Sequence, residues 1–164
     1  MTWQGARTEL PEFGLLFPLR RELTEVSYLG LGPRETTADR TAGGKMGAWS
    51  YNVRQDFAQN TPVYPQECGS RTGVYRAAVT GSGLNIGIGF AGDSMTFSAL
   101  PYTPHELENA RHLYELPRDD NKTVVRCAAF QRGVGGDNSW GAKPHADDCF
   151  AVEKGTSFRF TIQK

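Results

Sequence analysis

Glycine and proline interrupt this chain every few residues, and this punctuation restricts it to short secondary-structure elements. The 164 residues include 19 glycines and nine prolines, which separate segments rich in β-branched and aromatic side chains. Turn signals include Thr80-Gly81-Ser82-Gly83, Gly92-Asp93-Ser94 and Lys154-Gly155. The pattern predicts an all-β fold with strands at residues 14–19, 25–29, 74–79, 84–90, 95–100, 123–131, 149–152 and 157–162.

One short helix is expected among these strands. Thr103 has the form of an N-cap, Pro104 suits the first helical turn, and Glu106 can complete a capping box. The helix is predicted to run to about His112, and Pro117 prevents its continuation. Residues 39–47 are expected to form a mobile loop.

The length and charge of the chain limit how many domains it can form and which classes of partner it can bind. A chain of 164 residues suits one compact domain. Its 18 basic and 18 acidic side chains cancel, so we expect no nucleic-acid or anionic-membrane partner. No segment approaches the roughly 20 apolar residues of a membrane helix, and the N-terminus lacks an apolar signal region.

Three cysteines, Cys68, Cys127 and Cys149, make an odd number without a C-x-x-C spacing. This count argues against a disulfide framework and against a zinc site. We therefore expect free thiols and a cytoplasmic location.

Several sequence motifs resemble cofactor- or metal-binding motifs but lack the neighbouring structure or residue spacing that such sites need. Residues 87–92 match G-x-G-x-x-G, but a strand rather than a helix is expected to follow, so a dinucleotide site is not predicted. His105 and His112 lie seven residues apart and lack the H-E-x-x-H spacing of a zinc site. We predict no metal site and no cofactor in this chain.

Carboxylates are plentiful in the expected loops, at Asp119-Asp120, Asp137 and Asp147-Asp148. Glycoside hydrolysis needs two acids roughly 5 to 9.5 Å apart, with one of them desolvated. Adjacent exposed carboxylates usually only solvate a turn, and His145 beside them is interpreted as a solvated loop histidine rather than a general base. The residue chemistry therefore predicts a binding or accessory domain without catalytic residues.

Trp140 is the most informative candidate contact residue. It closes the glycine-rich run at residues 133–141, where a loop can present the flat apolar face of an indole to a sugar, a base or a partner protein. The alternative at this point is that Trp140 packs against the end of the β-fold.

A second informative segment covers residues 28–40. A strand is expected to end at Leu31, Gly32-Pro33 turns the chain, and Glu35, Asp39 and Arg40 offer charges that can pair across the following loop. Structural clamping of this loop is the favoured interpretation, with direct ligand contact as the alternative.

Together these segments resemble the C-terminal domain of the large bacterial β-galactosidases of glycoside hydrolase family 2, which also forms part of the β-galactosidase small chain. The resemblance runs from about Leu10 to Lys164. Its four landmarks, in order, are Leu29-Gly30-Leu31-Gly32-Pro33 with Glu35, Asp39 and Arg40; Thr61-Pro62-Val63-Tyr64-Pro65-Gln66-Glu67 with Gly69; Tyr102-Thr103-Pro104 with Glu106, Leu107 and His112; and Gly133-Val134-Gly135-Gly136-Asp137-Asn138-Ser139-Trp140.

The resemblance implies an antiparallel β-sandwich, the C-terminal portion of a galactose-mutarotase-like supersandwich. It implies that Trp140 forms an apolar platform for the sugar, with loop support from the side chains of Asp137, Asn138, Ser139, Glu35 and Arg40. In the family the catalytic glutamates lie in a barrel that these residues do not include, and Mg²⁺ and Na⁺ bind in that catalytic part. The implied reaction is retaining hydrolysis of terminal β-D-galactosides such as lactose.

Three positions depart from the family pattern. Relatives commonly have Trp and Tyr where this chain has Tyr28 and Thr37, and Asp where it has Asn138. We expect residues 1–9 to be a leader or an expression-derived segment and residues 10–164 to be the supersandwich domain. The domain normally continues further, so this chain is interpreted as its C-terminal portion.

These expectations lead to one prediction and two alternatives. The chain is predicted to support a catalytic barrel domain or large subunit of a β-galactosidase, to assemble as an oligomer, and to be inactive alone. It is alternatively a free-standing carbohydrate-binding module, or a purely structural sandwich that mediates subunit contacts.

Overall fold

The computed structural model describes residues 1–81, 87–118 and 121–164. Within these ranges strands predominate, and the all-β class is confirmed. The elements are β1 (Thr8–Leu10), β2 (Glu12–Arg20), β3 (Leu23–Gly32), β4 (Lys45–Asn52), α1 (Val53–Asn60), β5 (Arg71–Gly81), β6 (Gly87–Leu100), α2 (Pro104–Asn109), β7 (Lys122–Gln131), β8 (Phe150–Val152) and β9 (Phe160–Gln163), with 3₁₀ turns η1 (Leu113–Glu115) and η2 (Ala146–Asp148).

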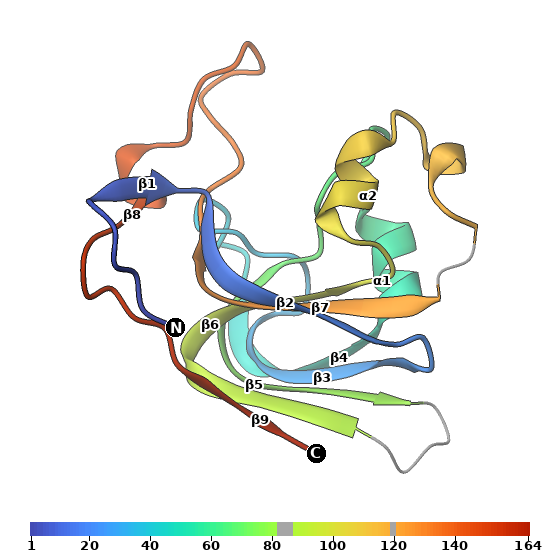
Figure 1. The fold of residues 1–164 in the computed structure, drawn as a ribbon. Helices are drawn as coiled ribbons and strands as arrows, with labels where there is room; N and C mark the ends of the chain where they lie inside the picture. The colour runs from blue at the N-terminus through green and yellow to red at the C-terminus, as the bar shows by residue number, and fades with distance from the viewer. Residues whose placement is uncertain (82–86, 119–120) are drawn as a thin grey trace.

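The strands form one large antiparallel sheet and one small one. The large sheet has the order β2-β7-β6-β5-β3-β4, and the small sheet pairs β1 with β8. One edge of β6 is shared, because its C-terminal half pairs with β7 and its N-terminal half pairs with β9. Figure 1 shows the result, in which β2 and β7 lie over the layer of β3, β4 and β5.

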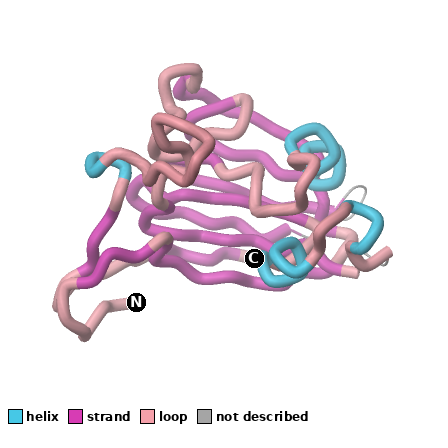
Figure 2. The backbone as a smooth tube through the Cα atoms, turned by 90° about the horizontal axis from the view of Figure 1, so that it is seen from above, coloured by secondary structure: helices cyan, strands magenta, loops and turns pink. Residues whose placement is uncertain are grey.

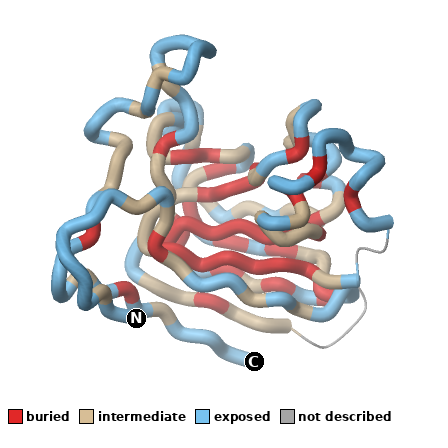
Figure 3. Tube along the Cα trace, turned by 45° about the horizontal axis from the view of Figure 1, so that its top comes forward, coloured by how far each residue is buried: buried red, intermediate tan, exposed pale blue. Residues whose placement is uncertain are grey.

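The core fills the space inside this curved sheet. Phe17 of β2 reaches Phe90 of β6 and Phe160 of β9, with ring centroids 6.1 and 5.9 Å apart. Figure 3 shows the buried positions running along the central strands. Each fully buried large apolar side chain contributes about 1.5–3 kcal/mol, so this interior is the main source of stability.

The two helices cover one end of the sheet. Phe57 of α1 and Leu107 of α2 share a second apolar cluster with Leu100 and Tyr102, and Figure 2 shows the helices at one end with the β1–β8 pair at the other. Neither helix, nor any other in the described ranges, has the length and apolarity needed to cross a membrane.

The helix predicted after Thr103 is present and begins as expected. The Glu106 amide donates to Thr103 Oγ1 at 3.2 Å, and the Thr103 amide donates to Glu106 Oε2 at 2.7 Å. It ends at Asn109 rather than His112. Helix α1 was not predicted, although Asn52 caps it through hydrogen bonds from the first-turn amides.

Two strand boundaries differ from the predictions. The predicted turn at residues 92–94 lies inside β6, where Ser94 has a φ of 56° and the register with β5 shifts. Residues 87–90 and 95–100 thus belong to one strand, while residues 82–86 lie outside the described ranges. The loop expected to reach Gly47 ends earlier, because β4 begins at Lys45 and pairs with β3 along its length.

The first nine residues, expected as a leader or expression-derived segment, lie against the C-terminal segment. The terminal amine donates to the Phe158 carbonyl at 2.9 Å, and the Trp3 amide donates to the Thr156 carbonyl at 2.8 Å. Trp3 also packs against the main core. The predicted strand at residues 157–162 is shorter, since β9 begins at Phe160.

Candidate functional site

Trp140 lies at the tip of a long hairpin between β7 and β8. This hairpin rises beyond β1 and β8 as the orange segment of Figure 1, on the side away from the helices. The Trp140 side chain is 90% exposed, which excludes the alternative that it packs against the end of the fold. An exposed indole on a protruding loop is free to stack on a ligand or a partner.

Short contacts hold the shape of the hairpin tip. The Trp140 amide donates to Asn138 Oδ1 at 2.8 Å, and lower down His145 Nε2 lies 2.7 Å from Asp137 Oδ1. A Cβ on Gly136 would lie 2.2 Å from the Ala142 carbonyl oxygen, so only glycine allows the two arms to approach. Of the predicted support residues, Asn138 thus contacts the Trp140 backbone, Asp137 pairs with His145, and Ser139 is exposed.

The Asp137–His145 pair also sets the ionisation of the histidine. The hydrogen bond to Asp137 and the negative charge of that carboxylate raise the pKa of His145. The pair joins Asp137 on one arm of the hairpin to His145 on the other.

The loop after Gly32-Pro33 contacts the base of the hairpin through Asp39. Asp39 accepts hydrogen bonds from the Val134 amide at 3.2 Å and the Gly135 amide at 2.7 Å. The Thr37 hydroxyl donates to the same carboxylate at 2.6 Å. Partial burial disfavours the charged carboxylate, but the hydroxyl and the two amides outweigh this effect and lower the pKa of Asp39.

Glu35 and Arg40 support this loop from within. Arg40 Nη2 pairs with Glu35 Oε1, and the other carboxylate oxygen of Glu35 accepts the Gly69 amide. Arg40 also donates from Nε to Thr37 Oγ1 at 3.2 Å. The predicted clamping of the loop is therefore seen, and these hydrogen bonds of Glu35 and Arg40 lie within this loop and at Gly69 rather than at Trp140.

A buried ion pair lies beneath the loop and was not predicted. Arg71 and Asp56 are 1% and 8% exposed, with Arg71 Nη2 2.7 Å from Asp56 Oδ1. Arg71 Nη1 also donates to the Gly69 carbonyl at 2.7 Å, which fixes the residue that binds Glu35. The sequence carries no spacing signal for this pair because it joins α1 to β5.

Three of the four landmark segments meet at one cavity. It has a volume of about 300 Å³ and is lined by residues from all three segments, including Glu35, Arg40, Pro62, Glu67 and Val134. The remaining landmark, residues 102–112, belongs to the helical end of the molecule. The resemblance thus rests on residues that gather around the base of the Trp140 hairpin, together with the capping box of α2.

The other candidate motifs form no reactive site. Residues 87–92 lie within β6, so the chain directly after them continues as a strand rather than as a helix. His112 pairs with Glu115 at 3.0 Å on the surface. Across residues 1–81, 87–118 and 121–164, no three His, Cys, Asp or Glu side chains gather closely enough to hold a metal ion. Asp119 and Asp120 lie outside the described residues.

The three cysteines are free. Burial raises the pKa of both Cys68 and Cys127 to about 12, so these thiols stay protonated at neutral pH. Because the thiolate is the nucleophilic form, neither is a candidate nucleophile.

Comparisons with known proteins agree with the resemblance. The family described as beta galactosidase small chain matches residues 1–162. A β-galactosidase of Lactobacillus delbrueckii subsp. bulgaricus is 40% identical over 94% of this chain and 15% of its own length. A β-galactosidase of Priestia megaterium is 38% identical, again over 94% of this chain and 15% of the relative.

A separate small subunit is also among the relatives. The β-galactosidase small subunit of Latilactobacillus sakei is 38% identical over 85% of this chain, which spans 46% of that subunit. The chain thus corresponds to a minor part of its full-length relatives. With its residues 1–162 matched throughout, the chain belongs to the β-galactosidase small-chain family.

Proposed function

We propose that this chain forms part of a β-galactosidase and presents Trp140 as a sugar platform to a catalytic barrel supplied by the rest of the enzyme. The reaction would be retaining hydrolysis of terminal non-reducing β-D-galactose residues, as in lactose. The observation that carries the proposal is the 90% exposure of Trp140 at the tip of an anchored hairpin. The names of the relatives support the choice of enzyme.

The chemistry of the tip suits this role. One face of a galactose ring is lined by C–H groups, which pack favourably on an aromatic face. Asp137, Asn138 and Ser139 precede Trp140 in the same exposed segment, and we propose that they supply the polar contacts to the sugar. The catalytic carboxylates, and the Mg²⁺ and Na⁺ of the family, would belong to the barrel, so the isolated chain is expected to hydrolyse nothing.

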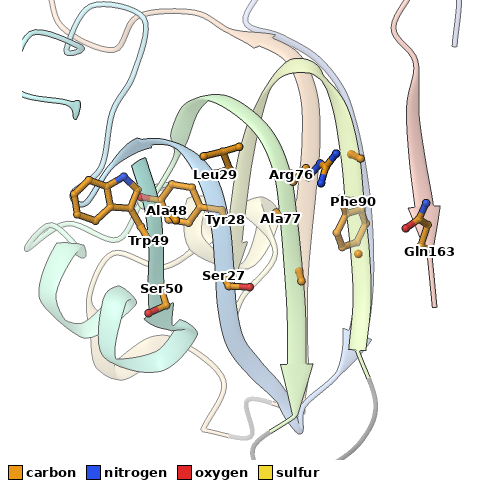
Figure 4. Close-up of a pocket in the computed structure, with 13 residues that line it drawn as sticks. Ser27, Tyr28, Leu29, Ala48, Trp49, Ser50, Arg76, Ala77, Phe90 and Gln163 are labelled. Carbon is orange, nitrogen blue, oxygen red and sulfur yellow. The ribbon is translucent and has the colours of Figure 1, made fainter. Parts of the chain in front are cut away.

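A shallow depression on the sheet indicates where other residues of the enzyme would pack. It has a volume of about 730 Å³ and crosses adjacent strands from β4 to β9 (Figure 4). Leu29 is exposed there beside the small side chains of Ala48, Ala78 and Ala91, and a flat face of this kind suits a second layer. We propose that other residues of the small chain cover it, since this chain spans 46% of the related small subunit.

The cellular location is part of the same proposal. All three cysteines are free, as expected in a reducing compartment. We propose a cytoplasmic location, which the free cysteines support.

Complementation tests the enzymatic role. A related β-galactosidase that lacks this region is mixed with the chain, and hydrolysis of a chromogenic galactoside is measured. The chain should restore hydrolysis. Trp140→Ala should raise KM by roughly thirtyfold, the effect of removing a contact worth about 2 kcal/mol, while the fold is retained.

Tyr114→Ala is the matched control, because Tyr114 is also an exposed aromatic, at 78%, but lies at the helical end. It should leave KM unchanged. No restored hydrolysis with the unmodified chain would contradict the enzymatic role, and equal KM values for Trp140→Ala and Tyr114→Ala would contradict the platform.

The two alternative functions give different outcomes. A free-standing carbohydrate-binding module would bind galactose alone, with a saturable change in tryptophan fluorescence that Trp140→Phe abolishes. A structural subunit contact would leave the chain insensitive to sugar but would lose oligomers in Trp140→Ala. In the proposed function, Trp140 contacts the sugar only in the assembled enzyme.

A further inference from the structure

The Asp39 carboxylate ties the base of the Trp140 hairpin to the loop after Gly32-Pro33, beside the backbone hydrogen bond from the Arg132 amide to the Pro11 carbonyl. Asp39 Oδ2 accepts the Gly135 amide at 2.7 Å, and Oδ1 accepts the Val134 amide at 3.2 Å. The two amides are consecutive along the arm that leads to Trp140. Two hydrogen bonds from consecutive amides to one carboxylate fix the direction of that arm as well as its position.

The glycines of the hairpin base are spaced to admit this carboxylate. A Cβ on Gly133 would lie 3.0 Å from Asp39 Cβ and Cγ, and a Cβ on Gly135 would lie 3.1 Å from Asp39 Oδ2. A larger residue at either position would require the Asp39 side chain to shift. Gly133 and Gly135 thus leave room for Asp39, and Gly133 also faces the Asp148 side chain, whereas Gly136 faces Ala142.

Asp39 is itself held in place by its own loop. The Thr37 hydroxyl donates to Asp39 Oδ1 at 2.6 Å, and Arg40 donates from Nε to that hydroxyl at 3.2 Å. The Thr36 amide donates to the Ser70 carbonyl at 2.9 Å, next to the start of β5. The anchor therefore connects the hairpin to the large sheet rather than to another free loop.

We infer that Asp39 is a positioning residue for Trp140, which sets the direction in which the hairpin presents the indole. The Asp137–His145 bridge and the close approach of Gly136 to Ala142 hold the hairpin together further out. Loss of the Asp39 anchor should therefore let the hairpin pivot as a unit without opening its tip. The anchoring of the hairpin by Asp39 follows from its contacts with the Val134 and Gly135 amides, and only its effect on sugar binding rests on the proposed function.

NMR spectroscopy of the ¹⁵N-labelled chain tests the anchor without any sugar. Asp39→Asn keeps the size of the side chain but replaces one acceptor oxygen with a donor. It should shift the Val134 and Gly135 amide protons upfield and lower the heteronuclear NOE of the Trp140 indole, which is assigned by its loss in Trp140→Phe. In the unmodified chain the same two amide protons should titrate with the Asp39 carboxyl.

Asp93→Asn is the matched control, because it removes one negative charge from an exposed position in β6, outside the hairpin. It should leave the two amide protons and the indole NOE unchanged. If Asp39→Asn does not fold, Gly135→Ala tests the same contact from the other side, since its Cβ would lie 3.1 Å from Asp39 Oδ2 and the carboxylate must shift to make room. Unchanged amide shifts and indole NOE in Asp39→Asn, or in Gly135→Ala, would overturn the inference.

The complemented enzyme separates the anchor from the sugar role. Asp39→Asn should raise KM about tenfold, the change expected when a hydrogen bond to a charged group is lost, and kcat should stay within about twofold because the residue touches no reacting atom. A loosened hairpin with an unchanged KM would leave the anchor standing and contradict the platform. An unchanged Trp140 indole NOE in Asp39→Asn would contradict the anchor, whatever value KM takes.

Discussion

At the scale of single residues, the sequence predicted the contact residue better than its supports. Trp140 stood out because glycines surround it, and the structure exposes it fully. The charges at Glu35, Asp39 and Arg40 predicted pairing within the loop, and Glu35 pairs with Arg40. The Asp39 anchor could not be predicted, because its partners are backbone amides 95 and 96 residues away, and amides carry no sequence signature.

His145 gives the first prediction, at the same scale. The Asp137 carboxylate raises the pKa of His145 above its ordinary value of 6.5. The charged pair therefore contributes fully below pH 6.5, and its contribution is lost as the pH rises through the higher folded-state pKa. The Trp140 indole NOE should fall across that rise in pH.

The control for this titration is His145→Gln, which cannot carry the charge. Its indole NOE should not change over the same pH range. A fall in the NOE that persists in His145→Gln would assign the transition to another group and contradict the bridge.

At the scale of elements, the sequence predicted a helix or turn correctly where the residues that stabilise it are close together in the chain. The capping box of α2 lies within four residues and was predicted, with both hydrogen bonds present. The turn predicted at residues 92–94 was wrong because β9 pairs with that part of β6, and Gly92 lies opposite Phe160. A partner nearly 70 residues away thus keeps a glycine-containing segment extended.

The ion pair between α1 and β5 gives the second prediction, at this scale. Asp56→Ala leaves the Arg71 guanidinium buried without its carboxylate, which should lower the free energy of unfolding by about 3–5 kcal/mol. Urea unfolding followed by circular dichroism measures the change. The helical end and the Glu35 loop should loosen together, because Arg71 holds the Gly69 carbonyl.

Glu22→Ala provides the comparison, since Glu22 pairs with Arg20 on the surface. Exposed pairs of this kind contribute at most about 1 kcal/mol. Similar losses in the two variants would contradict the structural role assigned to the buried pair.

At the scale of the whole molecule, the fold class was predictable and the curvature was not. Glycine, proline and β-branched spacing gave the strands and the all-β class. The way β6 divides one edge between β7 and β9 depends on contacts between distant segments, such as Phe17 with Phe160. Regular alternation along one strand cannot specify which neighbours it takes.

The open sheet gives the third prediction. The isolated chain leaves edge strands β2 and β4 and the depression of Figure 4 uncovered, and uncovered edges and faces promote association. Sedimentation velocity should show a mass that increases with concentration. Ala48→Lys, which places a charge in the depression, should reduce association, whereas Thr41→Lys in the exposed loop before β4 should not.

A strictly monomeric chain at high concentration would contradict this account of the sheet face. Equal association of the Ala48→Lys and Thr41→Lys variants would also contradict it.

The central claim is that Trp140 contacts a galactoside only when the rest of the enzyme is present. Incorporation of 5-fluorotryptophan, with the position-140 signal assigned by its loss in Trp140→Phe, allows ¹⁹F NMR to observe this indole directly. Addition of a non-hydrolysable galactoside should shift that signal in the complemented enzyme and leave it unchanged in the isolated chain. An unshifted signal in an active complemented enzyme saturated with the galactoside would contradict the account.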